Sequence, residues 1–222
     1  MQIISIQVGL PQTHTDKTGI GSADSVWTTA YSKQPVSGAV WFGKTELAGD
    51  GHANMQNHGG PEKAGCIYPV ENYEFWRQEA GLLELAVGAF AENFTTEGLI
   101  EDQVCVGDTY SFGEVVVQVS QPRGPCWKVC RWLGVSDLAT KMEQTGRTGW
   151  YVRVLKEGNI EAGARIELIE RPFPEWNIML ANQMAYGSGV PVEKMKEFAA
   201  CPLLAESWRT RVLTKIAALE RQ

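Results

Sequence analysis

The sequence lacks several features that would identify a function directly. It contains neither a GxxxxGK[ST] phosphate-binding loop nor a GxGxxG dinucleotide fingerprint. It has no apolar run of the ~18 residues that a transmembrane helix needs, so we expect no membrane span. Basic residues do not predominate, because 20 Lys and Arg face 26 Asp and Glu. A protein that coats a nucleic-acid polymer needs a basic surface, so that class is disfavoured, whereas a local basic pocket for one phosphate group is compatible with this composition.

The N-terminal residues and the cysteines bear on the cellular compartment. Residues 1–19 do not resemble a signal peptide, since they carry no basic region at the start and Ser5 and Gln7 interrupt the apolar run. The five cysteines are an odd number. Without a secretion signal we expect a cytoplasmic protein with free thiols.

Short alternating segments predict a chain that is mostly β with helices (α+β). Ile4, Ile6 and Val8 alternate with polar residues and are expected to share one face of a strand. Residues 109–112 and 115–119 flank Gly113-Glu114 and predict a hairpin, and residues 150–155 and 165–169 predict a second one. Several short strands with regular turns are typical of an antiparallel barrel or sandwich.

Helical periodicity interrupts this pattern. Pro69 is expected to begin a helix that runs to residue 79, and Ser136 to cap a helix that ends at Gly146. After the Pro-rich stretch 171–174 the sequence predicts three helices, over residues 176–184, 192–199 and 205–220. We therefore expect a domain over residues 1–171 and a small three-helix domain over 172–222.

The segment 121–128, QPRGPCWK, is the most unusual part of the chain. Its two prolines and its glycine form a stiff turn after a predicted strand, and Cys126 lies at the end of that turn. Positive charge from Arg123 and Lys128 and the start of a helix would favour the thiolate, which ligates metals and attacks electrophiles. The alternative is a buried, unreactive cysteine.

Cys126 and Cys130 also form a C-x3-C pair. With His52 and His58 this pair would supply the ligands of a zinc site. The spacing differs from the usual C-x2-C and no second pair accompanies it, so zinc is the weaker reading.

Three other segments carry polar groups that could bind a ligand. In 49–63, His58 precedes Gly59-Gly60, whose backbone a ligand could approach closely, and Lys63 adds a positive charge. The segment 92–98 is rich in hydrogen-bonding side chains, and 146–150 contains Arg147, which could hold a phosphate or carboxylate. Each segment alone could equally be a loop that satisfies its own backbone.

Taken together and in this order, these segments resemble the MOSC domain family, named after the C-terminal domain of molybdenum cofactor sulfurase. The resemblance rests on GDGHANMQNHGGPEKAG, FAENFTTEGL, VSQPRGPCWK and TGRTGWYVRVL, and extends over about residues 38–211. More narrowly, the chain is similar to YiiM-type members with a C-terminal three-helix extension. Ala91 and the pair Gly65-Cys66 depart from the residues that are usual in the family.

The resemblance implies a MOSC-type β-barrel that binds the molybdenum cofactor, molybdopterin, with Cys126 as the thiolate ligand to molybdenum. Soft thiolates suit such a centre. His58 and Asp50 are expected to handle protons. The candidate residues for binding the cofactor, besides Cys126, are Arg123, Lys128, Lys63, Asn93, Thr95, Arg147, Gly59 and Gly60.

The activity implied by the resemblance is reduction of N-hydroxylated compounds, such as base analogues, to amines, which would serve detoxification. Electrons would come from an external flavoprotein or cytochrome-type reductase, because the sequence shows no flavin, haem or iron–sulfur motif. Two alternatives remain: a carrier or sensor that holds the cofactor without turnover, and a cofactor-free thiol enzyme that uses Cys126 with His58.

Overall fold

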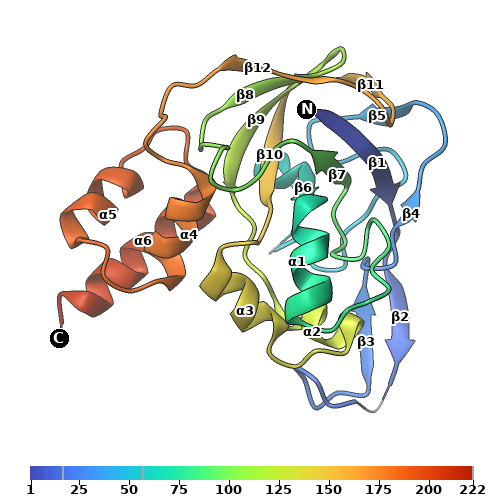
Figure 1. Ribbon diagram of the computed structural model, residues 1–222, viewed down its shortest axis with the longest axis horizontal. Helices are drawn as coiled ribbons and strands as arrows, with labels where there is room; N and C mark the ends of the chain where they lie inside the picture. Colours follow the sequence, from blue (N-terminus) through green and yellow to red (C-terminus); the bar gives the residue numbers. More distant parts are fainter. Residues whose placement is uncertain (17, 57, 222) are drawn as a thin grey trace.

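The computed structural model describes residues 1–16, 18–56 and 58–221. Its central element is an eight-stranded sheet with the strand order β12-β8-β9-β10-β6-β7-β1-β4 (Figure 1). Neighbouring strands are antiparallel except β6 and β7, which are parallel. The bounds are β1 Gln2–Val8, β4 Gln34–Pro35, β6 Gly65–Pro69, β7 Phe94–Glu97, β8 Thr109–Phe112, β9 Val115–Pro122, β10 Trp150–Lys156 and β12 Ile166–Glu170.

The sheet is curled but its described ladders do not close into a barrel. The start of β1 meets the residues that lead into β12 through one bridge, Gln2 with Arg165. Three backbone hydrogen bonds support this contact: Ile3 N to Ala164 O at 3.0 Å, Gly163 N to Ile3 O at 2.8 Å and Ile166 N to Met1 O at 3.0 Å. The rest of that edge of β1 is taken by β4, which pairs with Gln7 and Val8. The α+β class is confirmed, whereas a closed barrel is not confirmed by the described ladders.

Of the two predicted hairpins, one is confirmed and one is wrong. The hairpin of β8 and β9 is present, with Thr109 opposite Gln118. The predicted hairpin of residues 150–169 is wrong, because both edges of β10 are occupied by β9 and β6, and β12 pairs with β8. Two small sheets pair β2 (Gln12–Thr15) with β3 (Val26–Thr29) and β5 (Val40–Phe42) with β11 (Gly158–Ile160).

The alternation in β1 is broken by a bulge. The register with β7 shifts between Ile3 and Ser5, so the strand buries Ile3 and Ile6 while Ile4 is 37% exposed. The expected shared face of Ile4, Ile6 and Val8 is therefore wrong, since a bulge moves the following side chains to the other face.

The helices lie close to the predicted ranges but begin differently. Pro69 belongs to β6 and Val70 caps α1, and Asp137 rather than Ser136 occupies the N-cap of α3. Gly146 ends α3 in the left-handed conformation, as predicted. The bounds are η1 Pro61–Lys63, α1 Glu71–Glu79, α2 Trp127–Leu133, α3 Leu138–Thr145, α4 Ile178–Tyr186, α5 Val192–Ala199 and α6 Glu206–Leu219. No helix in the described ranges has the length and apolarity to cross a bilayer.

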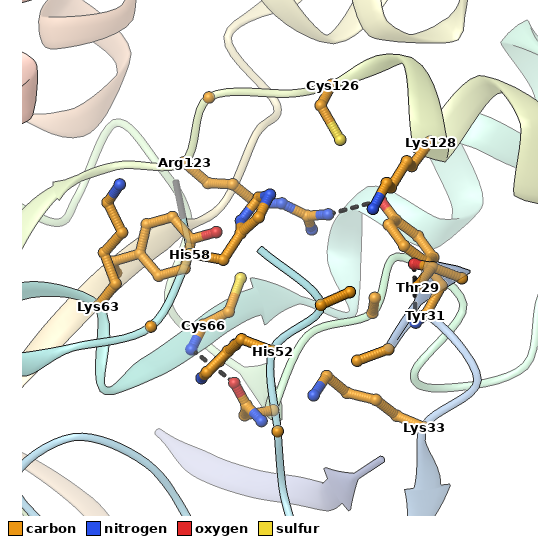
Figure 2. Close-up of a pocket in the computed structure, with 18 residues that line it drawn as sticks. Thr29, Tyr31, Lys33, His52, His58, Lys63, Cys66, Arg123, Cys126 and Lys128 are labelled. Atoms are coloured by element: carbon orange, nitrogen blue, oxygen red, sulfur yellow. Dashed lines mark hydrogen bonds between the residues drawn. The ribbon is translucent and has the colours of Figure 1, made fainter. Parts of the chain in front are cut away.

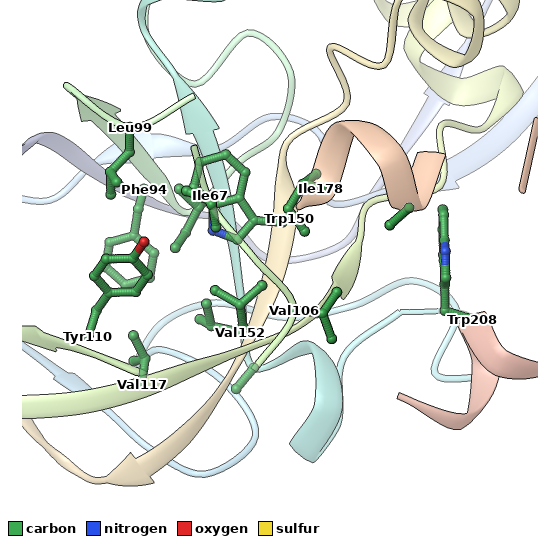
Figure 3. Packing of buried hydrophobic residues seen from close by; sticks show 14 of the residues in the cluster. Ile67, Phe94, Leu99, Val106, Tyr110, Val117, Trp150, Val152, Ile178 and Trp208 are labelled. Carbon is green, nitrogen blue, oxygen red and sulfur yellow. The ribbon is translucent and has the colours of Figure 1, made fainter. Parts of the chain in front are cut away.

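Two apolar clusters hold these elements together. The larger one runs without interruption from the sheet, where Phe94 and Val152 lie, to Trp208 of α6 (Figure 3). The smaller one lies under α1, α2 and α3 and includes Trp76 and Val129. Helices α4, α5 and α6 gather at one side of the molecule, and α1, α2 and α3 gather at another (Figure 1).

Candidate functional site

A pocket lies where segments distant in the sequence meet. It is lined by the end of β3 and the residues that follow it, by parts of the loop 51–59, by Cys66 of β6 and by the turn that follows β9 (Figure 2). Four cationic side chains line it, Lys33, Lys63, Arg123 and Lys128, whereas no carboxylate of the described residues does. Such a pocket favours an anionic ligand.

The turn 122–125 places Cys126 at the pocket. The turn is fixed to the strand beside it by the hydrogen bond from Arg123 N to Gly149 O at 3.0 Å. Cys126 is the N-cap of α2, and its side chain is only partly buried. Its sulfur is directed toward the pocket interior (Figure 2). Cys126 is therefore not a buried cysteine, as the alternative interpretation requires.

Arg123 is the cation deepest in the pocket. The residue is 6% exposed, and its Nη2 donates to the Tyr31 hydroxyl at 2.7 Å. Within the described ranges its Nη1 has no hydrogen-bond partner. A buried guanidinium with an unpaired N–H is costly unless a ligand completes it. The orphaned Nη1 therefore indicates an anion or an acceptor in the pocket.

Burial and the charge of the pocket together determine the protonation of His58. Burial, followed by the positive charges of Arg123, Lys63 and Lys128, lowers the pKa of His58 to about 4. His58 is therefore a neutral imidazole at pH 7 in the free protein. It can accept a proton, but it cannot deliver one until an anion offsets the neighbouring charges.

Gly59 is required for a close contact. Its φ is 75°, and a Cβ at this position would lie 2.4 Å from Cδ2 of His52. Gly60 has a φ of 83° but faces open space and does not line the pocket. His52 lies 3.7 Å from a carboxylate oxygen of Glu46, and burial lowers the pKa of His52.

Asp50 lies behind the pocket and is engaged in a hydrogen-bond network. Its carboxylate forms an ion pair with the buried Lys33 and accepts from Gly9 N at 2.8 Å and from Asn93 Nδ2 at 2.8 Å. Asn93 Oδ1 in turn accepts from Cys66 N at 3.0 Å. Asp50 thus positions a lining lysine and a lining asparagine, and it does not itself line the pocket.

Thr95 and Arg147 are not brought to the pocket. The Thr95 hydroxyl is fully buried, donates to Glu92 at 2.7 Å and accepts from Gln7 at 3.1 Å. Arg147 donates to Asn72 Oδ1 at 2.7 Å and lies over the Phe75 ring at 4.3 Å. Both side chains are satisfied by the fold elsewhere.

The geometry does not support the zinc reading. Cys130 is buried, lies outside the pocket and has its sulfur beside Ala139 N at 3.3 Å. No group of three or more His, Cys, Asp or Glu suited to a metal ion occurs in residues 1–16, 18–56 and 58–221.

Several lining residues were not predicted as part of the site, among them Tyr31, Lys33, Cys66 and Tyr151, and His52 was considered only as a zinc ligand. Cys66 faces the pocket from β6, and burial raises the pKa of its thiol to about 11. Burial also raises the pKa of the Tyr31 and Tyr151 hydroxyls, so both remain protonated donors. Cys66 and Tyr151 reach the pocket through the pairing of β6 with β10, whereas Tyr31, Lys33 and His52 lie outside helices and strands, so no local pattern pointed to them.

Comparison with known proteins identifies related chains. The family model described as "MOSC domain" matches residues 54–167. The YflK protein of Bacillus subtilis (strain 168) is 39% identical over 96% of this chain and 93% of its own length. Protein YiiM of Escherichia coli (strain K12) is 36% identical over 84% of each chain. A Gibberella moniliformis protein named "Reductase" is 36% identical over 79% of this chain but only 32% of its own length.

Solved structures show the same fold. The crystal structure of YiiM from Geobacillus stearothermophilus aligns with a TM-score of 0.78 at 37% identity, covering 97% of this chain and 98% of that one. The crystal structure of YiiM from Escherichia coli aligns with a TM-score of 0.73 at 27% identity, covering 98% and 94%. Both alignments cover nearly the whole of this chain.

Proposed function

Since this chain belongs to the MOSC domain family, we propose that it is an oxidoreductase that uses the molybdenum cofactor to reduce N-hydroxylated compounds to amines. One observation carries the proposal: a partly exposed thiol, Cys126, shares a pocket with the buried Arg123, whose Nη1 has no partner among the described residues. A fungal relative that carries the name "Reductase" supports the reaction class.

The donor set of the pocket fits this cofactor. A thiolate from Cys126 is a soft ligand that suits molybdenum. Arg123, Lys63 and Lys128 line the same pocket and would pair with the phosphate of the pterin. The unsatisfied Arg123 Nη1 is the atom that such an anion would complete.

When bound, the cofactor would supply two-electron oxygen-transfer chemistry, in which an N-hydroxyl compound takes up two electrons and two protons and yields an amine and water. The electrons would come from an external flavoprotein or cytochrome-type reductase. His58 would deliver a proton to the N-hydroxyl group once a bound anion offsets the burial and the neighbouring charges that now lower its pKa to about 4. Asp50 would act as a positioning residue, because its carboxylate holds Lys33 and Asn93.

The role of Cys126 can be tested by substitution with a matched control. Wild type, Cys126→Ala and Cys130→Ala would be purified, analysed for molybdenum, and assayed for reduction of an N-hydroxylated adenine with a reductase as electron donor. Cys130 is one helical turn from Cys126 but outside the pocket, so its variant controls for the loss of a thiol. We expect the activity of Cys126→Ala to fall by at least 10–100-fold, which is the loss that removal of an outer-sphere partner causes at a metal site. Cys130→Ala should retain both metal and activity.

Three outcomes would redirect the proposal. Undiminished turnover by Cys126→Ala would remove this sulfur from the mechanism. Molybdenum bound by wild type without reduction of any N-hydroxyl substrate would identify a carrier or sensor. Activity of molybdenum-free protein that is abolished by alkylating Cys126 would identify a thiol enzyme.

A further inference from the structure

A second cavity lies between helices α3 and α4, which are neighbours in Figure 1. Its lining comes from the last turns of α3, from Gly146, from the inner face of α4 and from Gly187 and Ser188. Among the described residues it shares none with the Cys126 pocket. The family resemblance assigns no role to these residues.

The cavity contains a buried acceptor without a donor. Asn182 is fully buried, and its Nδ2 donates to Gly146 O at 3.1 Å and to Thr148 Oγ1 at 2.8 Å. A backbone carbonyl can only accept, so the bond to Gly146 fixes the orientation of the amide. In the part of the chain that the structure describes, Asn182 Oδ1 has no partner. It is therefore available to accept a hydrogen bond from a ligand.

The other polar groups of the cavity have matching chemistry. Glu143 is partly buried and contributes a carboxyl group to the lining, and no Lys, Arg or His of the described residues lines the cavity. The buried hydroxyl of Tyr186 also lacks a partner in the described ranges. Met179 adds an apolar surface. An unpaired acceptor and a carboxyl group beside an apolar surface suit a flat ligand with N–H donors. Two cations lie at the edge, Arg211 over the Tyr186 ring at 5.3 Å and Lys215, which donates to Gly187 O.

We propose that this cavity binds a small planar nitrogen compound whose N–H donors reach Asn182 Oδ1 and the Glu143 carboxylate, of the amidine, guanidine or amino-heterocycle class. Binding needs neither Cys126 nor a cofactor, so the inference stands independently of the proposed function. The hydroxyl of Tyr186 lies 3.2 Å from the position of a Cβ on Gly124, so this wall of the cavity contacts the turn that leads to Cys126.

The test uses benzamidine as the probe and the full chain without cofactor. Isothermal titration and amide chemical-shift mapping would be compared with benzoate, which has the same ring but the opposite charge. We expect saturable binding of benzamidine with shifts in α3 and α4, and no binding of benzoate there. Glu143→Gln should weaken benzamidine about tenfold or more, as loss of a charged hydrogen-bond acceptor does.

Two further variants make the result specific. Tyr186→Phe removes only the unpartnered hydroxyl and should weaken binding severalfold, whereas Glu197→Gln makes the same charge change as Glu143→Gln on the exposed face of α5 and should leave binding unchanged. Asn182 itself is left intact because its Nδ2 supports the fold. The proposal is overturned by the absence of saturable binding, by equal affinity for benzoate, or by equal affinities of Glu143→Gln and Glu197→Gln.

Discussion

At the scale of single residues, His58 shows how the pocket sets a protonation state. Its pKa is about 4 in the folded protein, compared with about 6.5 for an unperturbed histidine. The unfolded chain therefore binds this proton more readily than the folded chain between these two values. The folded state must therefore lose stability as the pH falls from about 6.5 toward about 4. Above that range the neutral His58 causes no such loss.

We expect His58→Gln to abolish this pH dependence. Wild type should lose up to about 3 kcal/mol more unfolding free energy than His58→Gln between pH 7 and pH 4, less where water reaches the imidazole. Urea unfolding of both proteins at the two pH values measures the difference. Equal losses would show that the cations around His58 do not act on it as the geometry indicates.

The sequence predicted for some residues, but not for others, that the side chain reaches the pocket. His58, Lys63, Arg123, Cys126 and Lys128 belong to two segments with unusual local patterns, and all of them line the pocket. Thr95 and Arg147 have suitable side chains too, but residue type does not reveal direction. Thr95 points to Glu92, and Arg147 turns toward α1. Cys66 was missed because its buried strand resembles ordinary core.

At the scale of elements, the ion pair of Asp50 and Lys33 ties separate segments together. Asp50 also accepts from the backbone after β1 and from Asn93, the residue before β7. Both charged side chains are almost entirely buried, at 6% exposed for Lys33 and 1% for Asp50. Removing one partner leaves an uncompensated charge in the interior, whereas removing both leaves none.

We expect Asp50→Asn to lower the unfolding free energy by about 3–5 kcal/mol, because it leaves the Lys33 ammonium buried and unpaired. The double variant Lys33→Met/Asp50→Asn should recover a substantial part of that loss, since the asparagine oxygen can still accept a hydrogen bond. Urea unfolding of wild type, both single variants and the double variant gives the coupling energy. A double variant that is less stable than Asp50→Asn would contradict a buried, coupled pair.

Element predictions succeeded where contacts are local. The hairpin of β8 and β9 follows from a turn of two residues, and α5 has the predicted bounds because its periodicity is sustained. The predicted pairing of β10 with β12 is wrong because the partners of a strand can come from distant parts of the chain. In this protein β6 and β9 pair with the two edges of β10. Helix starts shifted by one or two residues, since Val70 and Asp137 cap α1 and α3 without a side-chain hydrogen bond that the sequence could reveal.

At the scale of the whole molecule, the larger apolar cluster joins the sheet to the C-terminal helices. Trp208 of α6 is 2% exposed and belongs to the same cluster as Val152 of β10. Its ring lies 5.8 Å from that of Tyr186 in α4. A continuous core of this kind favours joint unfolding of the parts that share it.

We expect a single calorimetric unfolding transition, and Trp208→Ala to shift the whole of it. Truncation of a buried tryptophan costs about 3–5 kcal/mol, which at this chain length corresponds to a decrease in Tm of roughly 10 °C. Differential scanning calorimetry, with far-UV circular dichroism at matched temperatures, tests this. Two separate peaks, with only one moved by Trp208→Ala, would show that the helices unfold on their own.

At this same scale the closed barrel is not confirmed. Short alternating strands predict a curved antiparallel sheet, and such a sheet is present, but closure depends on which segment takes the last free edge. Here β4 occupies the second half of β1, and β12 reaches only its first residues. A pairing of two residues, Gln34 and Pro35, carries too little pattern to be foreseen from the sequence.

The pocket around Cys126 draws its lining from residue 29 through residue 151, and no shorter stretch of the chain contains all of it. During synthesis, a ribosome must therefore have released the segment up to Tyr151 before the cavity can form. Any small molecule that occupies the pocket therefore binds only after residue 151 has emerged. A fragment truncated before that residue would lack part of the lining and would not form the complete pocket.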